Sequence, residues 1–243
     1  MSTTTPTHPT YRLADHVRAC HVDGQVVLLD LQRGKYIGAG GASLSSLSAL
    51  IADWPATGLD PGAMLADDGI TPWIDKLRQQ GLLVFASAAT PRRATLGMAQ
   101  ESLSYSDPTP SPGVPWRRIT RLAWSAAISA TWLKCHSLAT IAGKVAQLRA
   151  RGPGTVSSDR PGDLRLAAAW YLRMRPLVIT SHDKCLHDSL TLVHFLASEH
   201  FYPQWVIGVR TRPFAAHSWV QAGPLVLNDV HEYVRGFTPI LVV

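Results

Sequence analysis

Residues 215–229 read AAHSWVQAGPLVLND, and this stretch combines two strand patterns with a tight turn. Apolar and polar residues alternate on both sides of residues 222–224, which predicts an antiparallel hairpin. A three-residue turn at 222–224 pairs His217 with Asp229 and brings their Cβ atoms to about 5 Å. The proline in the turn favours this pairing, because it cannot donate a hydrogen bond to the ladder. A two-residue turn would instead pair His217 with residue 228 and place Asp229 on the opposite face.

Cys185 opens the segment CLHDSLTLVHFLASEH, residues 185–200, whose apolar spacing predicts a helix. The partial positive charge at a helix N-terminus lowers the pKa of a thiol and favours the thiolate. The backbone N–H of Cys185 is also free there to stabilise an oxyanion. A cysteine at a helix start, followed by a histidine and an aspartate on a sheet, is typical of papain-like and transglutaminase-like enzymes. We therefore predict Cys185 as the nucleophile, His217 as the general base and Asp229 as the carboxylate that orients the imidazole.

Each of these three residues has a plainer interpretation when it is taken alone. A free cysteine is more often a small buried apolar residue, and a strand histidine is usually packed or at the surface. An aspartate that follows an asparagine is usually a turn residue. Four histidines of the same region also suggest a zinc site: His182, His187, His194 and His200. Neither Cys-x-x-Cys nor His-Glu-x-x-His spacing occurs, so we expect no metal and no cofactor.

The composition fits a globular chain with a sizeable core. Of 243 residues, 46% are hydrophobic and 16% are charged, which suits one large or two small domains. The net charge of +6 permits binding to nucleic acid or to an acidic peptide, but the basic residues are scattered. Three cysteines argue against a disulfide scaffold, and with no secretory signal and no membrane span they predict a cytoplasmic protein. Of these cysteines, Cys20 and Cys135 lie in apolar patterns and are expected to be structural.

The chain divides into a polar tail at 1–10, a small domain at 11–85, a linker at 86–115 and a larger domain at 116–243. Proline, serine and threonine crowd the linker, where they cannot continue a helix or a central strand. The small domain has predicted strands at 11–22, 25–31, 35–40 and 82–86, with helices at 43–54 and 71–81. This order predicts a small winged-helix-like α+β domain.

In the larger domain, helices precede strands. Helices are predicted over 117–150, 163–175 and 185–200, and strands over 204–210, 217–221, 224–229 and 237–243. Helices followed by an antiparallel sheet are typical of α+β proteins rather than of doubly wound α/β proteins.

Three of these segments, KCLHDSLTLVHFL, WVIGVRTRPFAAHSWVQ and VLND, resemble the lasso-peptide B proteins, which are cysteine-dependent leader peptidases related to transglutaminases. The resemblance covers roughly residues 160–230 and places Cys185, His217 and Asp229 on the family's triad. Ser218 and Gln221 depart from it, since alanine and glutamate are common there. The resemblance implies two partners: a precursor peptide and an ATP-dependent, asparagine-synthetase-like cyclase that closes the freed core.

The first half resembles the family's precursor-recognition domain, which is akin to the PQQ-synthesis chaperone. In such domains the leader peptide adds as a strand to the edge of a three-stranded sheet, beside a helix. By this resemblance the edge strand is 34–38 and the helix is 72–80. The candidate leader contacts are Lys35, Tyr36, Ile37, Trp73, Leu77 and Arg78. Trp73 and Leu77 share the helix's apolar face, so a place in the core is the simpler interpretation for both.

Two other functions compete with leader cleavage. The same three residues would serve another acyl transfer, such as a transglutaminase or amidase reaction. A winged-helix domain with a basic surface could instead bind nucleic acid without catalysis. That function predicts a helix dense in Lys and Arg, whereas 72–80 holds only Lys76 and Arg78, beside Asp75.

Overall fold

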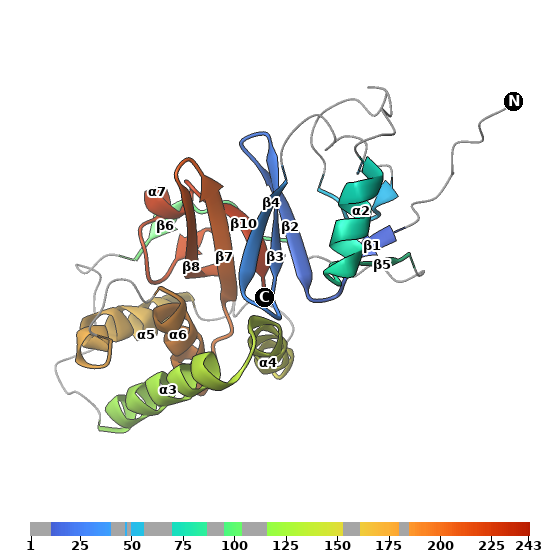
Figure 1. Ribbon diagram of the computed structural model, residues 1–243. Helices are drawn as coiled ribbons and strands as arrows, with labels where there is room; N and C mark the ends of the chain where they lie inside the picture. Colours follow the sequence, from blue (N-terminus) through green and yellow to red (C-terminus); the bar gives the residue numbers. More distant parts are fainter. Residues whose placement is uncertain are drawn as a thin grey trace, which may run out of the picture. The chain divides into compact units, whose positions relative to one another are not determined.

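The computed structural model describes residues 11–39, 47, 50–55, 70–86, 95–103, 116–152, 161–179 and 185–243. The chain forms two compact units, Met1–Arg93 and Ala94–Val243 (Figure 1). Half of the predicted helix at 43–54 and the whole tail at 1–10 lie outside the described residues, and residues 51–54 are not helical. None of the helices in the described ranges is long and apolar enough to cross a membrane.

The first unit contains a three-stranded antiparallel sheet of β2 (Val17–Val22), β3 (Gln25–Asp30) and β4 (Lys35–Ala39). The strands follow this order in space, so among the described strands β4 pairs only with β3. The predicted strand at 11–22 is in fact two strands, because a turn separates β1 (Tyr11–Leu13) from β2. β1 pairs with β5 (Leu83–Phe85) in a separate two-stranded sheet.

Helix α2 (Ile70–Gln79) packs against one face of the three-stranded sheet. Its Ile74 and Leu77 pack in a buried cluster with Val26 and Leu28 of β3. The side chains of a strand alternate between faces, so Ile37 of β4, opposite Leu28, packs against the same cluster.

The turn between β3 and β4 is held by a buried carboxylate. Asp30 accepts hydrogen bonds from the backbone N–H groups of Gln32 and Arg33 and, at 2.8 Å, from the Arg33 guanidinium. Burial would raise the pKa of Asp30, but these hydrogen bonds hold it below its usual value. Gly34 then adopts a positive φ of 64°, which a glycine accepts without strain. Arg33 also donates to the carbonyl of Gln80, so the turn is tied to the end of α2.

After residues 95–103, the second unit continues with helices. They are α3 (Trp116–Cys135), α4 (Leu138–Ala150), α5 (Pro161–Met174) with a short 3-10 turn at Arg175–Leu177, and α6 (Cys185–Ser198). The prediction of one helix over 117–150 is wrong, since the chain breaks after α3. Ser137 caps α4 by accepting a hydrogen bond from the N–H of Thr140 at 3.3 Å, which starts a new helix there.

The helices lie against a five-stranded sheet whose strand order is β10-β7-β8-β9-β6. Its strands are β6 (Glu101–Ser102), β7 (Gln204–Thr211), β8 (Phe214–Ala222), β9 (Leu225–Val226) and β10 (Thr238–Val242). A four-residue helix, α7 (His231–Val234), stands between β9 and β10. Figure 1 shows α6 beside β7 and β8, and side chains on α6 bond to β8. All pairings are antiparallel except β6 with β9.

Part of the predicted linker belongs to this sheet. Residues 95–103 run along β9, where the N–H of Gln100 donates to the carbonyl of Pro224 and that of Leu103 to Val226. Ala99 and Leu103 are buried. The linker prediction rested on the prolines and serines around this stretch, and it overlooked the short apolar run that packs on the domain.

The predicted three-residue turn at 222–224 is wrong. Ala222 pairs with Leu225, so the turn has two residues, of which Gly223 has a positive φ of 58°. The second strand is also shorter than predicted, since β9 contains Leu225 and Val226 alone. Asp229 therefore lies beyond the ladder, in a bend that follows it.

Candidate active site

His217 and Asp229 meet even though they are not a ladder pair. The Nε2 of His217 lies 2.5 Å from Oδ2 of Asp229, and both side chains are largely shielded from solvent, at 14% and 23% exposed. The other oxygen of Asp229 accepts a hydrogen bond from the N–H of Val230 at 2.7 Å. This double contact orients the carboxylate, which fixes the imidazole ring and leaves Nδ1 for another partner.

That partner is Cys185, the first residue of α6. Its burial would raise the pKa of the thiol, but a hydrogen bond with His217 and the backbone N–H groups of Ser218 and Leu186 lower it below the usual value. The start of α6 and the middle of β8 therefore converge on one sulfur atom.

The imidazole shows the complementary shift. Burial would lower the pKa of His217, but the hydrogen bonds with Asp229 and Cys185 raise it to about 9. A lowered thiol pKa next to a raised imidazole pKa favours a thiolate–imidazolium pair at neutral pH. A thiolate attacks a carbonyl directly, and an imidazolium can give its proton to a leaving amine.

Aromatic rings surround the imidazole. The His217 ring lies edge-on to Tyr233 at 5.2 Å between centroids, and 5.4 Å and 6.2 Å from the rings of Phe237 and Trp219. Gly208 stands directly opposite His217 on β7. The absence of a side chain at 208 makes room for Trp219 and Phe237.

Ser218, the first departure from the family pattern, is a buried structural residue. Its hydroxyl donates to the carbonyl of Val206 and accepts from the indole N–H of Trp205 at 2.9 Å. It also bonds Ser189 of α6 at 2.8 Å. An alanine at 218 would leave the buried indole with Ser189 as its remaining partner, so the serine fits this core.

Gln221, the second departure, is 1% exposed and uses its amide in both directions. Its Oε1 accepts from the indole N–H of Trp219, and its Nε2 donates to the carbonyls of Gly97 and Gly223 at 2.7 Å each. A glutamate cannot donate those two bonds while ionised. Gln221 thus ties residues 95–103 to the β8–β9 turn.

The leader-binding candidates do not all reach the surface of the first unit. Lys35 is exposed on β4 and Tyr36 is half-buried. On α2, Trp73 is half-buried, whereas Leu77 is 2% exposed and belongs to the core, so Leu77 is not available for a leader. The guanidinium of Arg78 lies over the rings of Tyr11 and Phe85, at 5.8 Å and 5.3 Å from their centroids.

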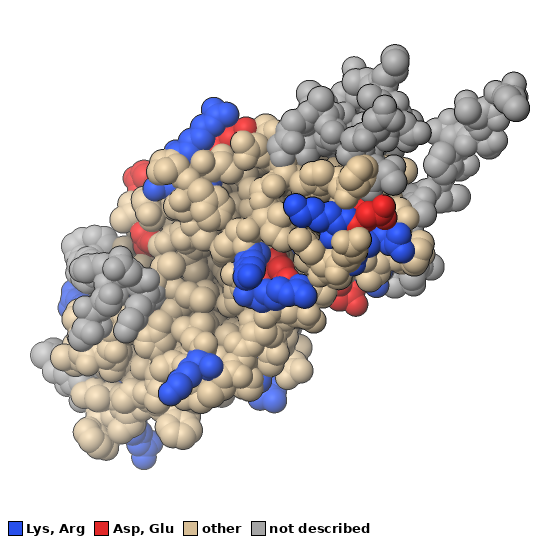
Figure 2. Space-filling view, viewed as in Figure 1, with Lys and Arg blue, Asp and Glu red and all other residues tan. Residues whose placement is uncertain are grey.

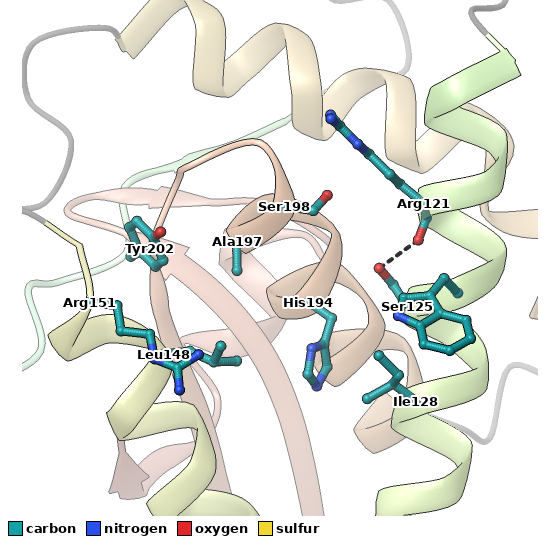
Figure 3. Close-up of a pocket in the computed structure, with 10 residues that line it drawn as sticks. Arg121, Ser125, Ile128, Leu148, Arg151, His194, Ala197, Ser198 and Tyr202 are labelled. Atoms are coloured by element: carbon teal, nitrogen blue, oxygen red, sulfur yellow. Dashed lines mark hydrogen bonds between the residues drawn. The ribbon is translucent and has the colours of Figure 1, made fainter.

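A cavity of about 320 Å³ lies at the other end of α6 (Figure 3). The cavity is bounded by α3, α4 and α6. His194 lies in its wall, nine residues after Cys185 and therefore about 14 Å from it along the helix axis. Burial and the nearby charge of Lys144 lower the pKa of His194 to about 4. The cavity is therefore separate from the thiol and lined by a neutral imidazole.

The surface and the histidines bear on the competing functions. On the face shown in Figure 2, Lys and Arg side chains occur in separate groups with Asp and Glu among them, not as a continuous basic stripe. Within the described residues, no cluster of three His, Cys, Asp or Glu side chains could hold a metal ion. His182, one of the four histidines considered for zinc, lies outside those residues.

Comparison with known proteins defines the class of the second unit. Residues 126–242 match the family model of the transglutaminase-like superfamily, so the chain contains a transglutaminase-like domain. A stretch of 45 residues is 49% identical to the microcin J25-processing protein McjB of Escherichia coli. This stretch is 18% of the chain and covers 22% of that relative's length. No solved structure matches the chain.

Sequence reasoning missed several residues around the three candidates. Asp188 lies one helical turn after Cys185, and Asn228 precedes Asp229, yet neither was singled out for a role. The spacing from Cys185 places Asp188 on the same face of α6, which was a usable indication. Nothing in the sequence pointed to Tyr171 or Arg175, which contact Asp188 from another helix and its end.

Proposed function

We propose that this protein is the leader peptidase of a lasso-peptide pathway in the cytoplasm. The observation that carries the proposal is the convergence of Cys185, His217 and Asp229, with the thiol pKa lowered and the imidazole pKa raised to about 9. The transglutaminase-like domain and the partial match to a microcin-processing protein support a peptide substrate.

In this mechanism the Cys185 thiolate attacks the carbonyl carbon of the peptide bond between leader and core. The tetrahedral oxyanion is stabilised by N–H groups at the start of α6. As the C–N bond breaks, the His217 imidazolium gives its proton to the leaving nitrogen, which becomes the free amine of the core. A thioester then joins the leader to Cys185.

Water completes the reaction. The neutral His217 takes a proton from a water molecule as the oxygen attacks the thioester, and the leader leaves with a free carboxylate. The sulfur departs as the thiolate, next to a protonated His217, so the starting ion pair is restored. Asp229 stays ionised throughout and stabilises the cation. The freed amine would then pass to the ATP-dependent, asparagine-synthetase-like cyclase.

The first unit would hold the leader while the second unit cuts. An extended leader would add as a strand beside β4, which pairs only with β3 among the described strands, with main-chain hydrogen bonds for affinity and Tyr36 and Trp73 beside it. Lys35, Ile37 and Arg78 complete the proposed surface. Docking makes cleavage effectively intramolecular, at an effective concentration on the order of millimolar.

The direct test uses a precursor encoded beside this gene, incubated with the purified protein. Cys185→Ala should abolish cleavage while leader binding persists. Cys135→Ala is the matched control, because Cys135 is exposed on α3 and has no part in the mechanism, so cleavage should remain. Cleavage by Cys185→Ala at the wild-type rate would refute the proposal.

Acyl transfer to an amine is the second candidate, since the same three residues would form the same thioester. An added primary amine separates the two functions. A peptidase releases a leader carboxylate in its presence, whereas a transglutaminase-like acyltransferase releases a leader amide.

A further inference from the structure

Asp188 is a buried carboxylate in the first turn of α6, three residues after Cys185. It accepts a hydrogen bond from the hydroxyl of Tyr171 at 2.8 Å, and its other oxygen lies 3.2 Å from the Arg175 guanidinium. The same oxygen accepts from Nδ2 of Asn228 at 2.9 Å. A buried charge needs such partners, and here they come from α5, from the end of that helix and from the segment after β9.

Tyr171 remains a hydrogen-bond donor in this cluster. It is fully buried, and burial together with the negative charge of Asp188 raises its pKa well above the usual value. Arg175 supplies the positive charge that balances Asp188. The cluster is therefore satisfied and rigid, which allows it to fix the position of Asn228.

Asn228 uses its side chain in place of the backbone ladder. The N–H of Leu227 donates to the carbonyl of Val220, as in a regular antiparallel ladder. The N–H of Val220, however, donates to the side-chain Oδ1 of Asn228 at 2.8 Å. Nδ2 of the same amide donates to Asp188. The carbonyl of Asn228 is also within 3.5 Å of the Arg175 guanidinium. Both ends of the amide are thus engaged, and the backbone leaves the sheet at this residue.

This departure decides which residue reaches the imidazole. Extending the observed pairing of Ala222 with Leu225 would place Val230 opposite His217, and Asp229 would face away. The bend at Asn228 instead brings Asp229 to Nε2 of His217 at 2.5 Å.

We infer that Asn228 and Asp188 are positioning residues. Together they set the bend that brings Asp229 to His217, and they link this bend to the first turn of α6, which carries Cys185. The inference rests on the proposed function for its role in catalysis. It predicts that loss of the Asn228 amide acts on the thiol through Asp229.

The test measures alkylation of Cys185 by iodoacetamide between about pH 5 and pH 10, which reports the thiolate without any precursor. A Cys135→Ser background removes the other exposed thiol, since Cys20 is buried. Asn228→Ala and Asp229→Ala should each slow alkylation near neutral pH by about tenfold or more. The double variant with Asn228→Ala and Asp229→Ala should be alkylated no more slowly than Asp229→Ala alone, because both substitutions remove the same interaction, that of Asp229 with His217. A wild-type profile for Asn228→Ala, or additive losses, would overturn the inference.

Two further variants keep the result decisive. Ser198→Ala is the matched control, since its hydroxyl donates to the carbonyl of Phe195 at the end of α6 far from Cys185, and its profile should be unchanged. If Asn228→Ala does not fold by circular dichroism, Tyr171→Phe removes one donor to Asp188 and keeps the ring. Its profile should shift in the same direction by a smaller factor, and an unchanged profile would refute the positioning role. Alkylation that responds as expected without leader cleavage would instead refute the proposed function alone.

Discussion

Gly208 and His217 face each other across the β7–β8 ladder, and the space above the glycine is filled by rings that touch the imidazole. A Cβ at 208 would lie 2.8 Å from the Trp219 ring and 2.9 Å from Cβ of Phe237, which is closer than real contacts allow. Gly208 is therefore part of what shapes the candidate site, although it carries no functional group.

Gly208→Ala should lower cleavage by about tenfold or more, because Trp219 or Phe237 must shift and the His217 ring moves with them. The rate of precursor cleavage measures the effect, alongside the melting temperature. Gly143→Ala is the control, since Gly143 is in α4 with open space around its Cβ position. Alanine there should leave cleavage unchanged and stabilise the helix slightly. Equal activity of both variants would contradict the proposed packing.

Gln221→Glu should destabilise the second unit, although glutamate is common at this position in the family that the sequence resembles. The carboxylate would lose two donated hydrogen bonds and face the carbonyls of Gly97 and Gly223. The expected cost is on the order of 1–3 kcal/mol. Thermal unfolding checks it, and limited proteolysis should show earlier cutting within residues 95–103. A variant with wild-type stability would mean that the segment is held by other contacts.

The pH dependence of the thiol follows from the two opposite pKa shifts. Cys185 has a lowered pKa, so the thiolate should persist below the range of an ordinary cysteine, which titrates near pH 8.5. The pKa of His217 is raised to about 9, so cleavage should fall as the pH rises through about 9, where the proton for the leaving amine is lost. Alkylation by iodoacetamide, by contrast, should stay fast above that pH. Parallel loss of alkylation and cleavage at high pH would contradict this assignment.

Leader binding should depend on the β4 side of the first unit and not on the thiol. Tyr36→Ala and Trp73→Ala should each weaken binding of a leader peptide by about tenfold, as removal of a contact side chain commonly does. His21→Ala is the matched control, because β2 is the opposite edge of the same sheet. Calorimetry with a synthetic leader measures all three. Equal losses on both edges would argue against strand addition at β4.

Sequence reasoning predicted the helix that starts at Cys185, but it did not predict the geometry between His217 and Asp229. The position of Cys185 at a helix start followed from apolar spacing, and α6 begins at that residue. The pairing of His217 with Asp229 was predicted from a three-residue turn, whereas the turn has two residues. The contact exists because Asn228 bends the chain out of the sheet, and a side chain that replaces a ladder bond leaves no periodic trace in a sequence.

Tertiary contacts account for the other differences. The strand β6 has two residues, too few for alternation to show, and it is held by bonds to residues more than a hundred positions away. The break before α4 depends on a single capping serine inside a continuous apolar pattern. Leu77 lies on the face of α2 that packs into the core, so its side chain is buried and not available to a leader.

The central claim is that Cys185 forms a covalent thioester with the leader. Mixing the protein with precursor, quenching in acid within the first turnover and measuring the intact mass tests this directly. The account predicts an added mass equal to the leader, located on the peptide that contains Cys185 and released by hydroxylamine. Cleavage that proceeds with no adduct on Cys185, and that survives Cys185→Ala, would contradict it.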